Sequence, residues 1–279
     1  MEFDLYRNDG SILFSGMKTL YTTDTKTITV VASGFDYISS FRQVNSIHVA
    51  VVDSNENRII MVNRKDNSSR VIVDGKQRCD VRWMHDSDVK SYDPNHVELD
   101  ERNPGHLIFT DKSNNALRSV DLTSGTVSTV IKTGFNHPRG LTWYNGRLLV
   151  CNFHYISEVS WTCNGAVSNN KLTTNNAYGH RDGDFSIAEF SDPRELIQIR
   201  NGLFLVLDSE NRKLRILNMF TRKVLPVCIG SSGSCTNGTP LTYYAASILI
   251  SDKEIYVSEH RKIRKLTGKL VNYKITSIY

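Results

Sequence analysis

The sequence has no run of about 18 uncharged apolar residues, the length that a membrane-spanning helix needs. Its first ten residues, MEFDLYRNDG, also lack a basic segment followed by an apolar one, which is the pattern of an export signal. We therefore expect no membrane insertion and no export signal within these residues. Apolar residues make up 39% of the chain and charged residues 23%, a balance that excludes a disordered protein and can supply a core.

Several catalytic motifs are also absent. The sequence has no Gly-x-Ser-x-Gly motif, no glycine-rich phosphate-binding loop and no Cys-x-x-Cys pair. A protein without catalytic activity is therefore favoured over an enzyme. The 34 Lys and Arg against 29 Asp and Glu give a net charge of only +5, which does not require a nucleic-acid partner.

Helical periodicity is missing too, because no window of about 11 residues or more keeps an apolar stripe free of Gly, Pro and β-branched clusters. A strand pattern recurs instead. Each copy has a short apolar strand that ends in a polar residue, a tight polar loop, and a second strand that often begins with a basic residue. The six copies occupy residues 11–24, 48–63, 106–122, 147–162, 203–218 and 254–266.

A further strand precedes each copy, and a β-branched run follows most of them, so each unit has four strands. Dividing 279 residues by six gives about 46 per unit, within the range of a four-stranded propeller blade. A β-sandwich would need only about 100 residues. We therefore predict an all-β, six-bladed β-propeller with four antiparallel strands per blade, very little helix and a single domain, 1–279. The expected blades are approximately 1–34, 35–76, 77–134, 135–176, 177–230 and 231–279.

Polar residues mark the ends of the second strands. Asp53, Asp111 and Asp208 end such strands, and Arg58 and Arg212 open the strands that follow. An Asp at this place accepts backbone N–H groups in the turn, and an Arg opening the next strand can pair with it. We expect these five residues to build turns rather than bind a ligand.

Three connections are longer than a compact blade requires: 76–93, 175–192 and 231–243. Each joins an outer strand to the next inner strand, and in propellers such connections share a face with the loop inside each copy. Long loops are often functional, so this end, the top face, is the expected working surface.

The top face is expected to gather aromatic and arginine side chains, the composition of interface anchors. Phe153 is one of them, in a short loop. The candidate partner-binding residues are Arg82, Trp83, His85, His137, Arg139, His154, Tyr155, Arg181, Arg194, His260 and Arg261. The same composition suits single-stranded RNA, whose bases stack on aromatic and guanidinium planes.

The fifth unit, GHRDGDFSIAEFSDPRELIQIRNGLFLVLDSENRKLRIL (179–217), resembles the NHL repeat. The matching residues are Gly179, Asp182, Gly183, Ala188, Phe190, Pro193, Asp208, Asn211 and Arg212. Pro138, Gly140 and Asn152 match in the fourth unit, and the other units match more weakly. The resemblance implies an NHL-repeat six-bladed β-propeller that binds a protein or glycan or, as cytosolic NHL domains do, RNA.

Some NHL-like propellers are metal-dependent lyases, the peptidyl-hydroxyglycine amidating lyases among them, with histidines holding the metal in the central channel. The family's histidine after the strand-opening proline corresponds here to Arg139, and Asn95 follows Pro94. A metal-dependent lyase or hydrolase is therefore the second alternative after RNA binding. No cofactor is predicted, and Ca²⁺ or Zn²⁺ in the channel belongs to this alternative alone.

Five cysteines are present, an odd number that leaves at least one thiol unpaired within the chain. Cys228 and Cys235 flank IGSSGS and form the candidate disulfide. Cys151 and Cys163 should lie about 20 Å apart along their strands, too far to bond, whereas Cys79 remains a partner for Cys151. Sequons at Asn67 and Asn237 are candidate glycosylation sites. These features favour a secreted, extracellular or lumenal glycoprotein over a cytoplasmic one.

Overall fold

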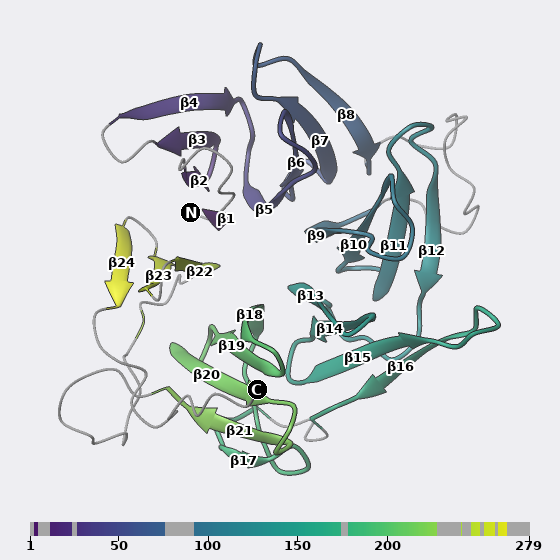
Figure 1. Cartoon of the computed structure of the whole chain (residues 1–279), viewed down its shortest axis with the longest axis vertical. Helices are drawn as coiled ribbons and strands as arrows, with labels where there is room; N and C mark the ends of the chain where they lie inside the picture. The colour runs from purple at the N-terminus through teal and green to yellow at the C-terminus, as the bar shows by residue number, and fades with distance from the viewer. Residues whose placement is uncertain are drawn as a thin grey trace.

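The structure is a computed structural model that describes residues 3–4, 12–23, 27–75, 92–173, 178–227, 241, 247–251, 254–259 and 262–266. These residues form strands and connections with no helix, and the expected all-β class is confirmed. Figure 1 shows the sheets arranged around a central axis. None of the described residues belongs to a helix that could cross a membrane.

Each blade is an antiparallel sheet whose strands lie side by side in chain order. Blade 1 contains β1 (Phe3–Asp4), β2 (Ile12–Ser15), β3 (Thr19–Thr23) and β4 (Ile28–Ser33). Blade 2 contains β5 (Ile38–Gln43), β6 (His48–Asp53), β7 (Arg58–Asn63) and β8 (Ser69–Asp74). Blade 3 contains β9 (Pro94–Leu99), β10 (His106–Asp111), β11 (Ala116–Asp121) and β12 (Val127–Ile131).

The second half of the chain continues the pattern. Blade 4 contains β13 (Leu141–Tyr144), β14 (Arg147–Cys151), β15 (Ile156–Trp161) and β16 (Val167–Lys171). Blade 5 contains β18 (Pro193–Arg200), β19 (Leu203–Asp208), β20 (Lys213–Asn218) and β21 (Lys223–Pro226), with β17 (Gly183–Asp184) added beyond β21. A last sheet contains β22 (Ser247–Ser251), β23 (Glu254–Glu259) and β24 (Lys262–Leu266).

The prediction of six four-stranded blades needs a correction. Within the described residues, five blades have four strands or more, and the sheet formed by β22, β23 and β24 has three. The fourth strand expected for that sheet, 270–278, lies outside the described residues. The innermost strands β1, β5, β9, β13, β18 and β22 contact one another in this order, and β22 contacts β1, so the sheets close into a ring (Figure 1).

Two strands differ from what the sequence suggested. The outer strand of blade 4, β16, has the polar sequence VSNNK and mostly exposed side chains, so no apolar run indicates it. It forms because its backbone continues the ladder along β15. The sequence indicated no strand at Gly183–Asp184, yet Gly183 pairs with Val224 on the outer edge of blade 5.

The core lies between neighbouring sheets, as expected for sheets that pack face to face. All six residues of β19, LFLVLD, are buried, because this strand has apolar neighbours on both faces. Phe204 and Val206 pack towards blade 4, while Leu205 and Leu207 pack towards Ile248. The second strands therefore carry nearly continuous apolar runs, the feature that made the repeat visible in the sequence.

In blades 2, 4 and 5, the polar residue at the end of the second strand holds the connection that enters the blade. Asp53 accepts the Tyr37 N–H at 2.9 Å, and Asp208 accepts the Ser191 N–H at 2.8 Å. Asn152 accepts the Asn136 N–H at 3.0 Å in the same way. The structural role expected for these strand-end residues is confirmed.

The sequence predicted the arginine that pairs with the strand-end aspartate in blade 2 but not the one in blade 5. Arg58 pairs with Asp53 at 2.9 Å, as expected. In blade 5, however, the partner of Asp208 is Arg215, at 2.8 Å, and Arg212 instead occupies the turn with φ +54°. Arg212 therefore builds the turn as predicted, whereas the sequence did not indicate Arg215, which is 1% exposed, as the partner of Asp208.

Hydrogen bonds place the inter-blade connections and the loops after the second strands at one end of the ring. The Phe153 N–H donates to the Asn136 carbonyl at 2.9 Å, and the Glu210 N–H donates to the Ser191 carbonyl at 3.1 Å. Each bond joins a loop inside a blade to the connection that enters the same blade. The top face inferred from the sequence is therefore a real surface of the ring.

Candidate ligand-binding site on the top face

Blades 4 and 5 begin with the same short sequence, X-Pro-Arg: His137-Pro138-Arg139 and Asp192-Pro193-Arg194. The residue before each proline has a left-handed backbone, with φ +48° at His137 and +49° at Asp192. Such backbone is uncommon for residues other than glycine, and strained positions gather at functional sites. Two of them therefore stand side by side where these blades meet.

A glycine brings the two arginines together. The Gly140 N–H donates to the Arg194 carbonyl at 2.9 Å, which joins the starts of the two blades directly. A Cβ atom on Gly140 would lie 2.4 Å from the Arg194 carbonyl oxygen and 2.8 Å from the Glu195 Cα. No larger residue permits this approach. Blade 3 supports the same point, because the Thr110 hydroxyl donates to the Arg139 carbonyl at 2.8 Å.

One carboxylate holds both guanidinium groups, an arrangement called here the arginine bridge (Arg139, Asp192 and Arg194). Arg139 Nε donates to Asp192 Oδ1, and Arg194 Nε donates to Asp192 Oδ2 at 3.0 Å. The Asp192 side chain is 3% exposed, while those of Arg139 and Arg194 are 16% and 29% exposed. The carboxylate is thus buried beneath two partly accessible cations.

Beside the arginine bridge lies a ring cluster of His137, Phe153, His154 and Tyr178. The ring centroids of Phe153 and His154 are 4.2 Å apart, and those of His154 and Tyr178 are 4.1 Å apart. Tyr178 is 69% exposed, which is unusual for so large an aromatic ring. The Asp192 N–H donates to the Phe153 carbonyl at 2.9 Å, so the bridge and the cluster form one site.

Of the two histidines in the ring cluster, His154 has a pKa that is shifted towards the neutral form of its ring. Burial lowers the pKa of His154, and the nearby Asp192 carboxylate opposes that shift only in part. The shift favours the neutral form of the His154 ring, and the arginine bridge supplies two guanidinium groups beside it.

Ten of the eleven predicted top-face residues fall into three groups. His137, Arg139, His154 and Arg194 belong to the site just described. Tyr155 is 4% exposed and its hydroxyl donates to the Gly134 carbonyl, and burial raises its pKa to about 12, so it is a structural residue. The predicted residues outside the described part of the chain are Arg82, Trp83, His85, His260 and Arg261.

Arg181 is exposed on the same face, but it pairs with Glu189 at 3.6 Å instead of joining the bridge. Sequence reasoning missed two members of the site, Tyr178 and Asp192. The only available signal was that Asp192 repeats the place of His137 before a proline and an arginine. Tyr178 gave no signal, because it lies in a long connection without periodicity.

The described residues contain no group of three or more His, Cys, Asp or Glu side chains placed to hold a metal ion. Cys151 is buried and free, and Cys163 is exposed and free. Burial raises the pKa of the Cys151 thiol, and nearby carboxylates add to the shift. The candidate disulfide Cys228–Cys235 lies outside the described residues.

Only one of the two glycosylation candidates can be placed. Asn67 is exposed in the turn between β7 and β8, with φ +60°. Asn237 lies outside the described residues.

The innermost strands carry a second polar group. Arg42 on β5 pairs with Glu98 on β9 at 3.0 Å, and His96 lies on β9 two residues before Glu98. Burial, together with the Arg42 charge, lowers the pKa of His96 to about 3. The imidazole is therefore neutral in the folded protein throughout the physiological range.

The lowered pKa of His96 predicts acid sensitivity. Below about pH 6.5 the unfolded chain binds a proton at this residue that the folded chain does not, so stability falls as the pH drops. At pH 5 the loss from this residue should be about 2 kcal/mol. Thermal unfolding of the wild type and of His96→Gln at pH 7 and pH 5 measures it. The variant should lose less stability between the two values, and identical losses would contradict the prediction.

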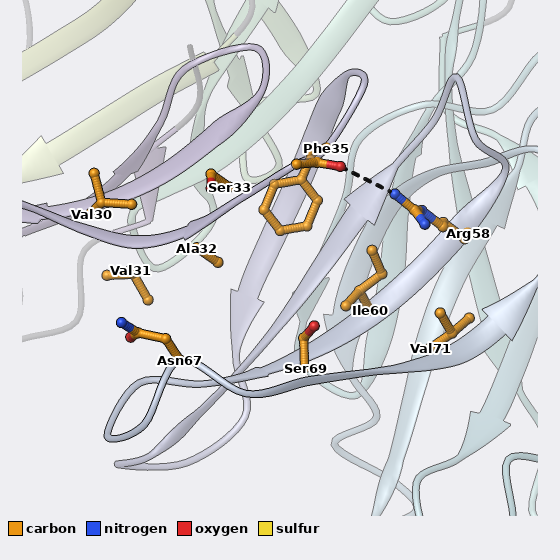
Figure 2. Close-up of a pocket in the computed structure, with 11 residues that line it drawn as sticks. Val30, Val31, Ala32, Ser33, Phe35, Arg58, Ile60, Asn67, Ser69 and Val71 are labelled. Atoms are coloured by element: carbon orange, nitrogen blue, oxygen red, sulfur yellow. Dashed lines mark hydrogen bonds between the residues drawn. The ribbon is translucent and has the colours of Figure 1, made fainter.

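A groove of about 410 Å³ opens on the side of the ring, between blades 1 and 2 (Figure 2). Its walls come from β4 and from β7 and β8, and include the exposed side chains of Val30 and Val71. Arg58 spans one end, donating to the Gly34 carbonyl at 3.5 Å, and Asn67 also lines the groove. The groove is far from the top-face site in the chain, and its walls combine apolar side chains with polar groups such as Arg58, Asn67 and Ser69.

The chain matches no protein-family model and no curated protein sequence. Its fold is similar to that of an auxiliary nutrient binding protein from Bacteroides ovatus, with a TM-score of 0.76 and 12% identity over 96% of this chain and 69% of that one. It is also similar to a catalytically inactive virginiamycin B lyase from Staphylococcus aureus with quinupristin, with a TM-score of 0.61 and 18% identity over 93% and 78%.

A third similar structure is the nidogen/laminin complex, with a TM-score of 0.61 and 14% identity over 88% of this chain and 84% of that one. The three proteins are named for different roles, and one fold can carry many functions. At these identities the likeness shows the fold alone. The chain is a β-propeller built of four-stranded antiparallel blades.

Proposed function

We propose that this protein is a binding module without catalytic activity, and that it binds a glycan, free or attached to a protein, where blades 4 and 5 meet on the top face. The observation that carries the proposal is the arginine bridge lying against the ring cluster. Exposed ring faces pack against the apolar faces of sugars, and guanidinium groups donate to sugar oxygens. The fold similarity to nutrient-binding proteins agrees with such a role.

The chemistry of the site favours binding over catalysis. Both oxygens of Asp192 already accept arginine N–H groups, so this carboxylate is poorly placed to take a proton from a substrate. His154 is largely buried within the ring cluster. Arg82, Trp83, His85, His260 and Arg261 lie outside the described residues, and their part in ligand binding stays a prediction from the sequence.

The proposal also covers the protein family, the number of blades and the location of the protein. The NHL motif of blade 5 supports membership of that family, because Asn211 donates to the Gly179 carbonyl at 2.6 Å and to Asp208 at 2.8 Å, which links three motif residues. We include the sheet of β22, β23 and β24 as the sixth blade. The exposed Asn67 sequon supports an extracellular or lumenal location.

A glycan array tests the function. The wild type should bind a defined class of oligosaccharides, and Tyr178→Ala should weaken that binding about tenfold or more, since an exposed stacking ring contributes on the order of 1–2 kcal/mol. The matched control is Phe220→Ala, which removes an equally exposed ring, 68% against 69%, at the opposite end of blade 5. Equal binding by both variants, or no binding by the wild type, would refute the proposal.

The RNA-binding alternative and the lyase alternative predict different experimental results. Binding of single-stranded RNA that weakens steeply as salt rises would favour the RNA-binding alternative. A stoichiometric site for Zn²⁺ or Ca²⁺, measured by titration of the metal-free protein, would favour the lyase alternative.

A further inference from the structure

The arginine bridge leaves donor groups unused. Arg139 reaches Asp192 through Nε, and its Nη1 and Nη2 atoms, which carry the remaining N–H groups, have no acceptor among the described residues. Arg194 also reaches Asp192 through Nε, and its Nη2 atom has only Glu210, at 3.9 Å. Partly buried guanidinium donors without acceptors favour an incoming anion.

The net charge of the arginine bridge also favours an anionic ligand. Two arginines share one carboxylate, so one positive charge is left over, and arginine does not lose its proton in proteins. Glu210 is 50% exposed, and an exposed pair at 3.9 Å neutralises little. The excess matches a group with a single negative charge.

The shape of the site selects among anions. A guanidinium is a planar fork that fits the two oxygens of a carboxylate. The ring cluster begins beside the bridge, because Asp192 donates to the Phe153 carbonyl and Phe153 contacts His154 and Tyr178. A carboxylate attached directly to a sugar ring therefore places its charge on the arginines and its ring on Tyr178.

The site is also held in position before a ligand arrives. Gly140 ties the two inner strands together, and Asp192 fixes both arginine side chains. Little side-chain freedom is then lost on binding, which favours affinity.

We infer that the top-face site takes acidic saccharides, with a uronic-acid carboxylate on the Nη groups of Arg139 and Arg194 and the sugar ring against Tyr178. This inference rests on the proposed function and deepens it. The probes are a short oligogalacturonate and a short glucuronate-containing oligosaccharide, because galacturonate and glucuronate are two common sugars with a carboxylate on the ring.

Calorimetric titration of the wild type with each oligomer and with its methyl ester tests the inference. Esterification removes the charge and keeps the ring, so we expect at least a tenfold loss of affinity for the ester. Sulfated neutral oligosaccharides form a further arm, and tighter binding of these would overturn the carboxylate assignment. Equal binding of acid and ester would overturn the inference and leave the glycan-binding function standing, whereas no binding of any oligosaccharide would overturn both.

Variants locate the carboxylate. Arg194→Gln should weaken binding of the acids about tenfold or more and binding of the esters by a clearly smaller factor, because the esters lose only a hydrogen bond to a neutral oxygen. Arg147→Gln removes the same charge from an exposed pair with Glu158 at the start of β14, away from the top face, and should bind like the wild type. Equal affinities of Arg194→Gln and Arg147→Gln for the acids would refute the assignment.

Discussion

Replacing Arg215 with methionine should lower the free energy of unfolding by about 3–5 kcal/mol, because the substitution strands a buried carboxylate. The Arg215 side chain is 1% exposed and donates to Asp208 at 2.8 Å, to Asp182 at 2.7 Å and to the Arg181 carbonyl at 2.7 Å. The Asp208 side chain is 0% exposed. Methionine fills similar space but supplies neither charge nor donors. Chemical denaturation of the purified variant measures the loss.

Two controls separate a stranded charge from lost packing. The double variant Asp208→Leu/Arg215→Met should be more stable than Arg215→Met alone, because it removes the unpaired charge as well. Arg147→Met removes an exposed arginine that pairs with Glu158 at 3.0 Å, and should cost less than about 1 kcal/mol. A double variant no more stable than the single one would contradict the explanation.

The stability of the Arg215→Met variant should also depend on pH. Burial already raises the pKa of Asp208 to about 6, and Arg215 opposes that shift. Without Arg215 the pKa should rise further, so the folded variant takes up a proton at Asp208 that the unfolded chain does not hold until lower pH. Its stability relative to the wild type should therefore improve as the pH falls from 7 to 5. A deficit that stays constant over this range would show that packing dominates.

The blades were predictable because their second strands are buried on both faces. A strand such as β19, with six buried residues, needs an unbroken apolar run, and such a run recurs in every unit. Strand β16 has mostly exposed side chains, so it leaves no pattern and is fixed by its backbone pairing with β15. Hydrophobic periodicity in the sequence indicates burial, so it identifies only strands whose side chains are buried.

The site was less accessible to sequence reasoning because its contacts cross between blades. Arg139 and Asp192 are separated by 53 residues, and nothing local indicates that one holds the other. Arg215 is also a charged residue that a local pattern assigns to solvent, although it is buried against Asp208. An ion pair buries a charged side chain in both cases, between two blades for Asp192 and between adjacent strands for Arg215, and no local sequence pattern indicates either pair.

Replacing Gly140 with alanine should cost about 3 kcal/mol and also abolish binding of acidic saccharides. The new Cβ would lie 2.4 Å from the Arg194 carbonyl oxygen, and because the obstacle is backbone, blade 5 must move away from blade 4. That movement breaks the Gly140 N–H bond to Arg194, which adds about 1 kcal/mol within this total. It also separates Arg139 from Arg194, so a single carboxylate can no longer contact both.

The matched control for Gly140→Ala is Gly16→Ala, where the added Cβ would meet, among the described residues, only the Tyr21 ring at 3.4 Å and the Thr19 carbonyl at 3.8 Å. This variant should unfold within about 1 kcal/mol of the wild type and keep its affinity for acidic saccharides. Denaturation and calorimetry on both variants separate two roles of Gly140. A Gly140→Ala protein that is destabilised but binds the acids normally would show that the two arginines act independently. Loss of both properties together is the expected result, because one backbone contact joins the blades and aligns the charges.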